Sequence, residues 1–189
     1  LTAVITIILG CGMPPTPTYV ILATCLVRPL TEMGASPLSA HMFIFMFACV
    51  GALTPPVAIT DYTAAAIAKA NPNKTGFTSF RMGIVAYIIP FIFLLNPAIL
   101  LEGGTTDVLL AAITAVIGVF CLTGAIEGYM FMYWSIPGRV LLGAAALLMM
   151  IPGSTTDLIG IGCAALAFAL DKLVIKPQPR KATSDIEKN

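Results

Sequence analysis

The chain has 189 residues, of which 58% are hydrophobic and 10% are charged, and its ten Lys and Arg nearly balance its nine Asp and Glu. Because a soluble domain carries about a quarter charged residues, this composition excludes a soluble globular enzyme. The balanced charge excludes a nucleic-acid-binding module, and the high hydrophobicity excludes a disordered chain. The composition therefore indicates an integral protein of a lipid bilayer.

The chain begins inside an apolar run at Leu1, without an initiator Met or a charged leader. We therefore expect it to be the C-terminal part of a longer polypeptide. Its five cysteines lie in apolar stretches with no CxxC spacing, so we interpret them as packing residues rather than as disulfides or metal ligands. They are Cys11, Cys25, Cys49, Cys121 and Cys163.

The first uncharged run, residues 1–27, is interrupted at 12–17 by three prolines, which are incompatible with the interior of a helix. Each half is then too short to cross a bilayer, which takes about 20 residues. We predict a re-entrant helical hairpin over residues 1–29. Its irregular tip is tolerable only where protein buries it or where it lines a wet cavity.

The second uncharged run continues to about Ala70 and is interrupted at 51–56. We predict a discontinuous transmembrane helix over residues 38–70, made of the halves 38–50 and 57–70. About four further membrane helices are expected at 82–101, 108–126, 140–151 and 158–170. The predicted fold class is thus an all-α integral membrane protein, with a core over 1–101, additional C-terminal helices over 102–175 and a polar tail at 176–189.

The basic residues predict the orientation in the membrane. If the hairpin returns to its own side, all ten Lys and Arg except Arg28 fall on the opposite side. Because cytoplasmic loops are enriched in Lys and Arg, we place the loop 71–81 and the C-terminus in the cytoplasm and the mouth of the hairpin outside. A cytoplasmic belt of aromatic residues is expected at Tyr129, Phe131, Tyr133 and Trp134.

The two interruptions predict an ion site. A proline lacks an N–H and frees the carbonyl four residues earlier. We therefore expect unpaired carbonyls at Gly51 and Ala52, and at Gly10, Cys11 and Met13 in the hairpin. Such carbonyls are costly at membrane depth, and a small hard cation would satisfy them. The N-terminal ends of the half-helices would favour an anionic group beside this cation.

Asp61 is the one acid well inside a membrane segment, which favours a role as a cation ligand or proton carrier. The alternative is a carboxylate that reaches water or caps local N–H groups. The isolated His41 is interpreted as an interfacial hydrogen-bonding residue, Glu127 as solvated at the inner interface, and Arg28 as an anchor in the outer headgroups. The candidate ion- and substrate-binding residues are Gly12, Thr16, Thr18, Gly51, Thr54, Pro55, Thr60 and Asp61, with Na+ held by Gly51, Ala52, Thr54 and Asp61.

Several segments carry the motifs of one transporter family. They are Gly12 and Met13 before the Thr-rich tip, the turn at 30–34 with Pro37, the segment 51–57 leading to 64–68, and 89–91 in the following helix. Over about residues 1–101 the chain resembles the large membrane subunit of the tripartite ATP-independent periplasmic (TRAP) transporters. The fused version, in which the small and large membrane subunits form one polypeptide working with a TAXI-type binding protein, fits best.

The resemblance implies the second inverted repeat of a Na+-coupled elevator permease in a bacterial or archaeal cytoplasmic (inner) membrane. Such a permease imports a small organic anion that a periplasmic binding protein delivers. The N-terminal part of the same permease, with the small-subunit helices, would be a further partner, and no cofactor is expected. Many relatives carry an acid where this chain has Thr16 and lack one at Asp61, so Na+ and H+ coupling both stay open.

Three other functions are weighed against this one. A Na+- or H+-coupled anion symporter with paired hairpins would need no binding protein. A membrane-embedded protease would need a Gly-x-Ser-Gly, a His-Glu-x-x-His or a second intramembrane Asp, and the chain has none of them. In a scaffold subunit without an ion path, Asp61→Asn and Thr54→Ala would leave transport intact.

Overall fold

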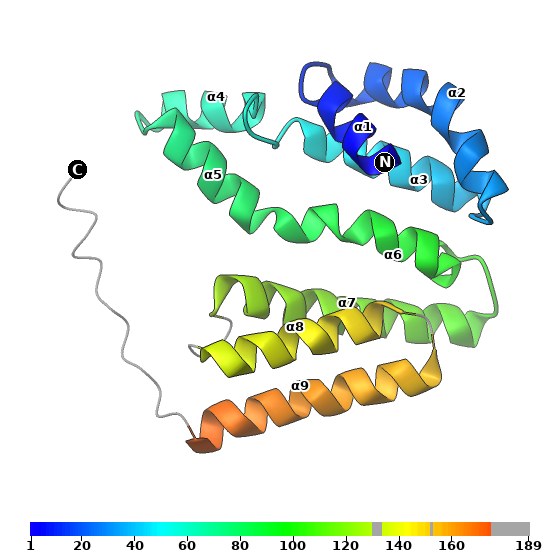
Figure 1. The fold of residues 1–189 in the computed structure, drawn as a ribbon, viewed down its shortest axis with the longest axis vertical. Coiled ribbons are helices and arrows are strands. Elements are labelled where there is room, and N and C mark those ends of the chain that lie inside the picture. Colours follow the sequence, from blue (N-terminus) through cyan, green and yellow to red (C-terminus); the bar gives the residue numbers. More distant parts are fainter. Residues whose placement is uncertain (130–133, 152, 175–189) are drawn as a thin grey trace.

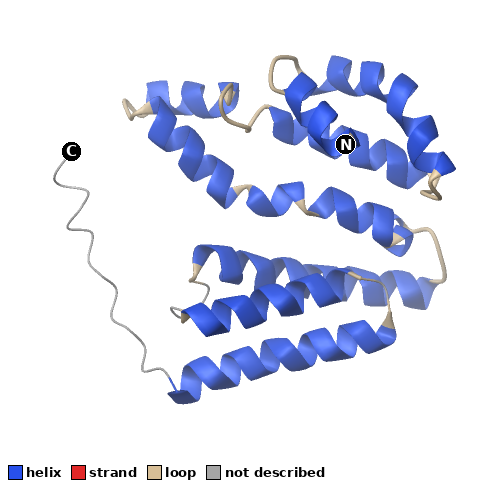
Figure 2. Ribbon diagram, in the orientation of Figure 1, coloured by secondary structure: helices blue, strands red, loops and turns tan. Residues whose placement is uncertain are grey.

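A computed structural model describes residues 1–129, 134–151 and 153–174. These residues form helices joined by short loops, and no strand occurs among them (Figure 2). This agrees with the predicted all-α class. The predictions for Phe131, Tyr133 and the tail at 176–189 lie outside the described residues.

Three helices form the N-terminal layer: α1 (Thr2–Gly10), α2 (Pro15–Glu32) and α3 (Pro37–Gly51). Both α1 and α2 pack against α3 (Figure 1). Ser36 Oγ accepts the N–H of Ser39 at 3.1 Å, which satisfies a free donor at the start of α3. The buried core of this layer consists of Leu22, Leu30, Ala40, Phe43, Ile44, Phe47 and Val50.

The hairpin tip is shorter than the predicted interruption at 12–17. The non-helical loop ends at Pro14, and α2 already begins at Pro15. The first residues of a helix need no N–H donor, so Pro15 and Pro17 fit within the first turn. At its other end α2 continues past Pro29 to Glu32, whose Oε1 lies 2.9 Å from Arg28 Nε. The prediction that the prolines abolish helix at 15–17 is therefore wrong.

The interruption after α3 leads to a shorter helix than predicted. The cis Pro55–Pro56 peptide bond and the left-handed Ala58 (φ 32°, ψ 52°) lie between α3 and α4 (Ile59–Ile67). The expected second half was 57–70. Ala58 delays its start, and Lys69 (φ 52°) adopts a second left-handed conformation just after its end. In Figure 1, α4 continues beyond the break in the general direction of α3.

The expected helix over 82–101 is divided into short pieces. The predicted loop at 71–81 is instead mostly helical: it forms α5 (Pro72–Met82), whose start is capped by the Asn71 side chain. After α5 come η1 (Ile84–Tyr87), α6 (Ile89–Leu95) and η2 (Pro97–Leu100). The segment Ile84–Leu95 is bent by 58° relative to α5. Pro97 has no N–H to continue α6, and Asn96 before it leaves helical geometry with φ −132° and ψ 82°.

The C-terminal layer is a three-helix bundle of α7 (Thr105–Glu127), α8 (Ile136–Met150) and α9 (Ser154–Val174), in which α8 contacts both neighbours (Figure 1). Small residues allow α8 and α9 to approach each other closely. A methyl group on Gly160 of α9 would lie only 3.2 Å from Ala145 O of α8. Trp134, expected in an aromatic belt, is only 6% exposed and packs edge-on against Phe168. It belongs to the bundle core, in the same buried cluster as Leu142 of α8 and Ala167 of α9.

Among the described helices, only α7 is long and apolar enough to cross a bilayer by itself, and the bent pair Pro72–Met82 and Ile84–Leu95 could form a second span. The surface of α7 is unusually apolar, and a large exposed apolar surface indicates contact with lipid or protein. Its exposed apolar side chains include Leu109, Leu110, Ile113, Val116, Ile117 and Phe120. The re-entrant placement of the hairpin stays a prediction.

Polar contacts at one end of the bundle fix its helices. The carboxylate of Asp171, 4% exposed, accepts the Ser135 N–H at 3.1 Å and also the Ser135 hydroxyl. Arg139 donates to the Ala125 and Ile126 carbonyls at the end of α7, at 2.8 and 2.7 Å. These bonds satisfy helix ends that would otherwise carry unpaired groups.

Replacing Asp171 with Ala is expected to destabilise the bundle by about 1–3 kcal/mol, because the Ser135 N–H loses its buried acceptor. Asp171→Asn keeps an acceptor oxygen and should lose less. Thermal unfolding of the whole permease in detergent measures the effect, with Lys172→Ala, at the exposed neighbouring position, as the control. An unchanged melting temperature for Asp171→Ala would contradict this role.

Candidate functional site

The hairpin tip and the interruption after α3 lie in direct backbone contact. Gly10 ends α1 and Gly51 ends α3. A methyl group on Gly51 would lie 2.7 Å from the carbonyl carbon of Gly10 and 2.8 Å from its Cα, so only a hydrogen atom fits there. The ends of α1 and α3, 41 residues apart from Gly10 to Gly51, are thus neighbours in space, and so are the non-helical segments that follow them (Figure 1).

A second contact joins the hairpin tip, residues 11–14 between α1 and α2, to the break, residues 52–58 between α3 and α4. Cys11 Sγ lies 3.9 Å from the carbonyl oxygen of Thr54, a long hydrogen bond of a weak donor. The Thr54 hydroxyl itself donates to Val50 O at 2.9 Å. Thr54 therefore presents its carbonyl toward the hairpin, while its side chain turns back to the last turn of α3.

The carbonyls predicted to be free in the break are not free. Gly51 O accepts the Thr54 N–H at 3.1 Å, and Ala52 O accepts the Thr60 hydroxyl at 3.1 Å. The prediction is wrong because the chain after Gly51 forms a tight turn, which brings the amide three residues later to its carbonyl. Each oxygen keeps one further lone pair.

The carbonyls of the hairpin tip differ from those of the break. Within the described residues, no hydrogen bond ends on the carbonyl oxygens of Gly10, Cys11 or Met13. The Pro14 carbonyl, in contrast, accepts both the N–H and the hydroxyl of Thr18. The unpaired backbone oxygens near the contact therefore belong to the tip.

Asp61 lies in the first turn of α4 and is only 6% exposed. Its Oδ2 is buried and has no hydrogen-bond partner among the described residues. A buried carboxylate without a partner is costly, and a cation or a proton would relieve that cost. No group of three or more His, Cys, Asp and Glu that could hold a metal occurs in the described part of the chain.

The remaining candidate residues are more dispersed. Gly12 lies exposed in the tip loop, and Thr16 is exposed on the first turn of α2. Thr18 is fully buried, but its hydroxyl donates to Pro14 O at 3.0 Å within its own helix. Thr60 is exposed and contacts the break through Ala52 O. The structure thus brings Gly51, Thr54 and their neighbours to the tip, and leaves the Thr16 and Thr18 hydroxyls without a hydrogen bond to the described residues of the break.

Two tyrosines that the sequence analysis did not consider bind the break. The Tyr87 hydroxyl lies 2.7 Å from Thr54 Oγ1 and 3.4 Å from Val50 O, and Tyr62 donates to Pro56 O at 2.7 Å. A tyrosine in an apolar run is a usable sequence signal, because its hydroxyl needs a partner when buried.

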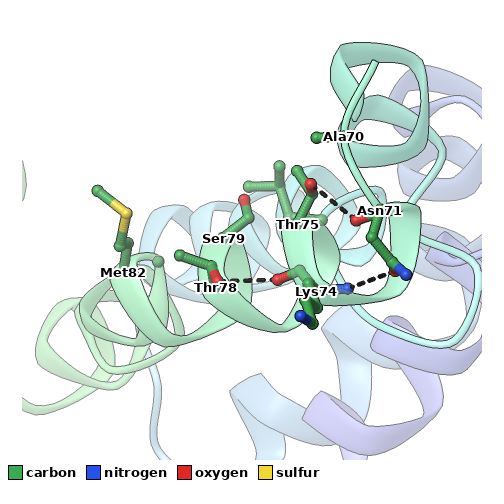
Figure 3. Close-up of a pocket in the computed structure, with 9 residues that line it drawn as sticks. Ala70, Asn71, Lys74, Thr75, Thr78, Ser79 and Met82 are labelled. Atoms are coloured by element: carbon green, nitrogen blue, oxygen red, sulfur yellow. Dashed lines mark hydrogen bonds between the residues drawn. The ribbon is translucent and has the colours of Figure 1, made fainter. Parts of the chain in front are cut away.

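A cavity of about 660 Å³ opens between the break and α5 (Figure 3). The residues of α5 that line it recur at helical spacing, which places them on one face. Lys74 is the only charged residue of the lining, and within the described residues it makes no ion pair. The lining consists of Leu53, Ala70, Asn71, Lys74, Thr75, Thr78, Ser79, Met82 and Gly83.

His41 and Glu127 lie outside this site. His41 Nδ1 is 3.0 Å from the Tyr19 hydroxyl, so His41 links α3 to α2. Glu127, predicted to be solvated, has its Oε2 3.4 Å from Arg81 Nη2 and its Oε1 buried. This ion pair joins the last turn of α5 to the end of α7.

A methyl group at Gly51 is expected to push the hairpin tip away from α3. The clash is with backbone atoms, which cannot rotate away, so Gly51→Ala should destabilise the permease by about 1–3 kcal/mol. Gly12→Ala is the matched control, because a methyl group there meets no atom within 4 Å. Thermal unfolding of both variants in detergent is the measurement, and equal melting temperatures would contradict the close contact.

Comparison with protein families matches residues 1–107 to the family described as tripartite ATP-independent periplasmic transporter, DctM component. The match is more than half of the 189 residues and includes the hairpin, the break and Asp61. Helices α8 and α9 lie beyond it. Comparison with curated proteins finds no match, and comparison with solved structures finds none either.

Proposed function

Because the chain belongs to the DctM component family of the tripartite ATP-independent periplasmic transporters, whose members are multi-pass membrane proteins, we propose that it forms part of a permease coupling Na+ entry to import of a small organic anion. The observation that carries the proposal is the buried Asp61, whose Oδ2 has no hydrogen-bond partner within the described residues and which lies just after a break that contacts the hairpin tip. Such a carboxylate inside a membrane protein favours an ion pathway.

Oxygen atoms suited to Na+ surround the break. Hard cations prefer carboxylate, hydroxyl and carbonyl ligands. In the proposed site, Asp61 supplies the charge and Thr54 the hydroxyl oxygen, and Gly51 and Ala52 use the lone pairs that their hydrogen bonds leave free. Coupling to H+ is the alternative for the same residue, with Asp61 carrying the proton.

The cavity beside α5 supports an anionic substrate. Its volume of about 660 Å³ is within the usual range for sites of small molecules. The ammonium of Lys74 and the hydroxyls of Thr75, Thr78 and Ser79 are groups that bind carboxylates, and no acid belongs to the lining. Leu53 connects this cavity to the break, so the anion would bind next to the ion site.

We also propose protein partners for the permease and a movement that carries the substrate across the membrane. A periplasmic binding protein, of the TAXI type in a fused permease, would deliver the substrate, and the N-terminal part of the permease would supply the other repeat. The permease would lie in the cytoplasmic membrane, with the C-terminus inside, and the hairpin and broken helix would move together as an elevator. The unequal distribution of Lys and Arg supports this orientation.

Asp61→Asn and Thr54→Ala are expected to weaken Na+ binding at least about tenfold, because each removes a proposed oxygen ligand or its charge. The measurement is binding of radiolabelled Na+ to the whole purified permease. Thr63→Ala is the control, since Thr63 is exposed on α4 and its hydroxyl donates to Ile59 O.

Retention of wild-type Na+ binding by both site variants would refute this assignment. Wild-type permease that binds no Na+, but moves protons with its substrate in liposomes, would replace Na+ by H+ as the coupling ion. In that case Asp61→Asn alone should abolish the movement of protons.

A further inference from the structure

Tyr87 occupies a distinctive position in the fold. It ends η1, directly after the bend that follows α5. Its ring packs edge-on against Phe80, with ring centroids 5.3 Å apart, and its hydroxyl reaches across to the break. The side chain therefore connects the bent segment to Thr54.

The available protons determine how this contact is arranged. The Thr54 hydroxyl lies 2.9 Å from Val50 O and can donate to it. The Tyr87 hydroxyl is 2.7 Å from Thr54 Oγ1 and 3.4 Å from Val50 O. Either hydroxyl can donate in the shorter contact, so the two hydroxyl protons are shared among Thr54 Oγ1, the Tyr87 hydroxyl and Val50 O.

The Tyr87 hydroxyl holds Thr54 Oγ1 in place. Whichever hydroxyl donates, Thr54 Oγ1 is hydrogen-bonded to Tyr87 and at least one of its lone pairs remains free. Without Tyr87, the Thr54 hydroxyl would keep only its contact with Val50 O among the described residues. A ligand oxygen binds a cation well only when its free lone pair is held in the correct direction.

We propose that Tyr87 is a positioning residue for the ion site: its hydroxyl orients Thr54 so that the remaining lone pair of Oγ1 faces Na+. The inference rests on the proposed function, because it concerns the same ion. Tyr87 acts through Thr54 and is not itself an ion ligand.

Tyr87→Phe removes the hydroxyl and retains the ring that packs against Phe80. The expected result is an increase of about fivefold in the Na+ concentration for half-saturation, which corresponds to the loss of one hydrogen bond. Radiolabelled Na+ binding to the whole permease measures it. Tyr62→Phe is the matched control, because Tyr62 also donates to the break but contacts Pro56 instead of Thr54.

A double-mutant cycle tests whether Tyr87 acts through Thr54. In the Thr54→Ala background, Tyr87→Phe should cause no further loss of Na+ binding, whereas in Thr54→Ser, which keeps a hydroxyl, it should still weaken binding. If Thr54→Ala binds Na+ too weakly to complete the cycle, the ratio of the Na+ and Li+ affinities of Tyr87→Phe is measured instead. Tyr87→Phe should reduce the preference for Na+ over Li+, because an unheld Thr54 oxygen can approach the smaller ion.

The outcomes separate the two proposals. Absence of Na+ binding to the wild-type permease overturns the proposed function and this inference together. Wild-type binding that Tyr87→Phe leaves unchanged overturns the inference alone. A further loss caused by Tyr87→Phe in Thr54→Ala makes Tyr87 a ligand or a purely structural residue, and an unaltered preference for Na+ over Li+ counts against the positioning role.

Discussion

Backbone oxygens inside a membrane protein need partners, and this requirement governs the N-terminal half of the chain. Prolines and glycines interrupt two neighbouring helices, and the fold places the interruptions against each other at Gly10 and Gly51. The break then satisfies two of its oxygens locally, because Ala52 O accepts the Thr60 hydroxyl and Pro56 O accepts the Tyr62 hydroxyl. Within the described residues, carbonyls of the tip and Oδ2 of Asp61 keep no hydrogen-bond partner, and Asp61 supplies the charge of the candidate ion site.

The sequence allowed the interruptions and the helical class to be predicted, because proline acts on its own backbone. It did not reveal that Pro15 begins a helix, since proline as a residue type can either end a helix or occupy its first turn. The partners of Gly51 and Ala52 and the contact of Tyr87 with Thr54 depend on how distant segments pack. Local patterns carry no information about such pairings, so the geometry of the candidate site required the structure.

The C-terminal bundle lies mostly beyond the residues that match the family, yet it is attached to the matched part. Arg81 and Glu127 form an ion pair between α5 and α7, and Ile92 of α6 belongs to the same buried cluster as Leu142 of α8. In lipid, apolar surface contributes little to helix association, so specific contacts of this kind determine how the helices are arranged. The bundle therefore packs against the bent segment that carries Tyr87.

The meeting of Gly10 and Gly51 also has a directional consequence. Two main chains at van der Waals distance form a steric stop: the tip cannot advance farther, and sideways sliding along α3 would bring it against residues bulkier than glycine. A closer approach of the tip to the end of α3 is therefore blocked at this point of the fold.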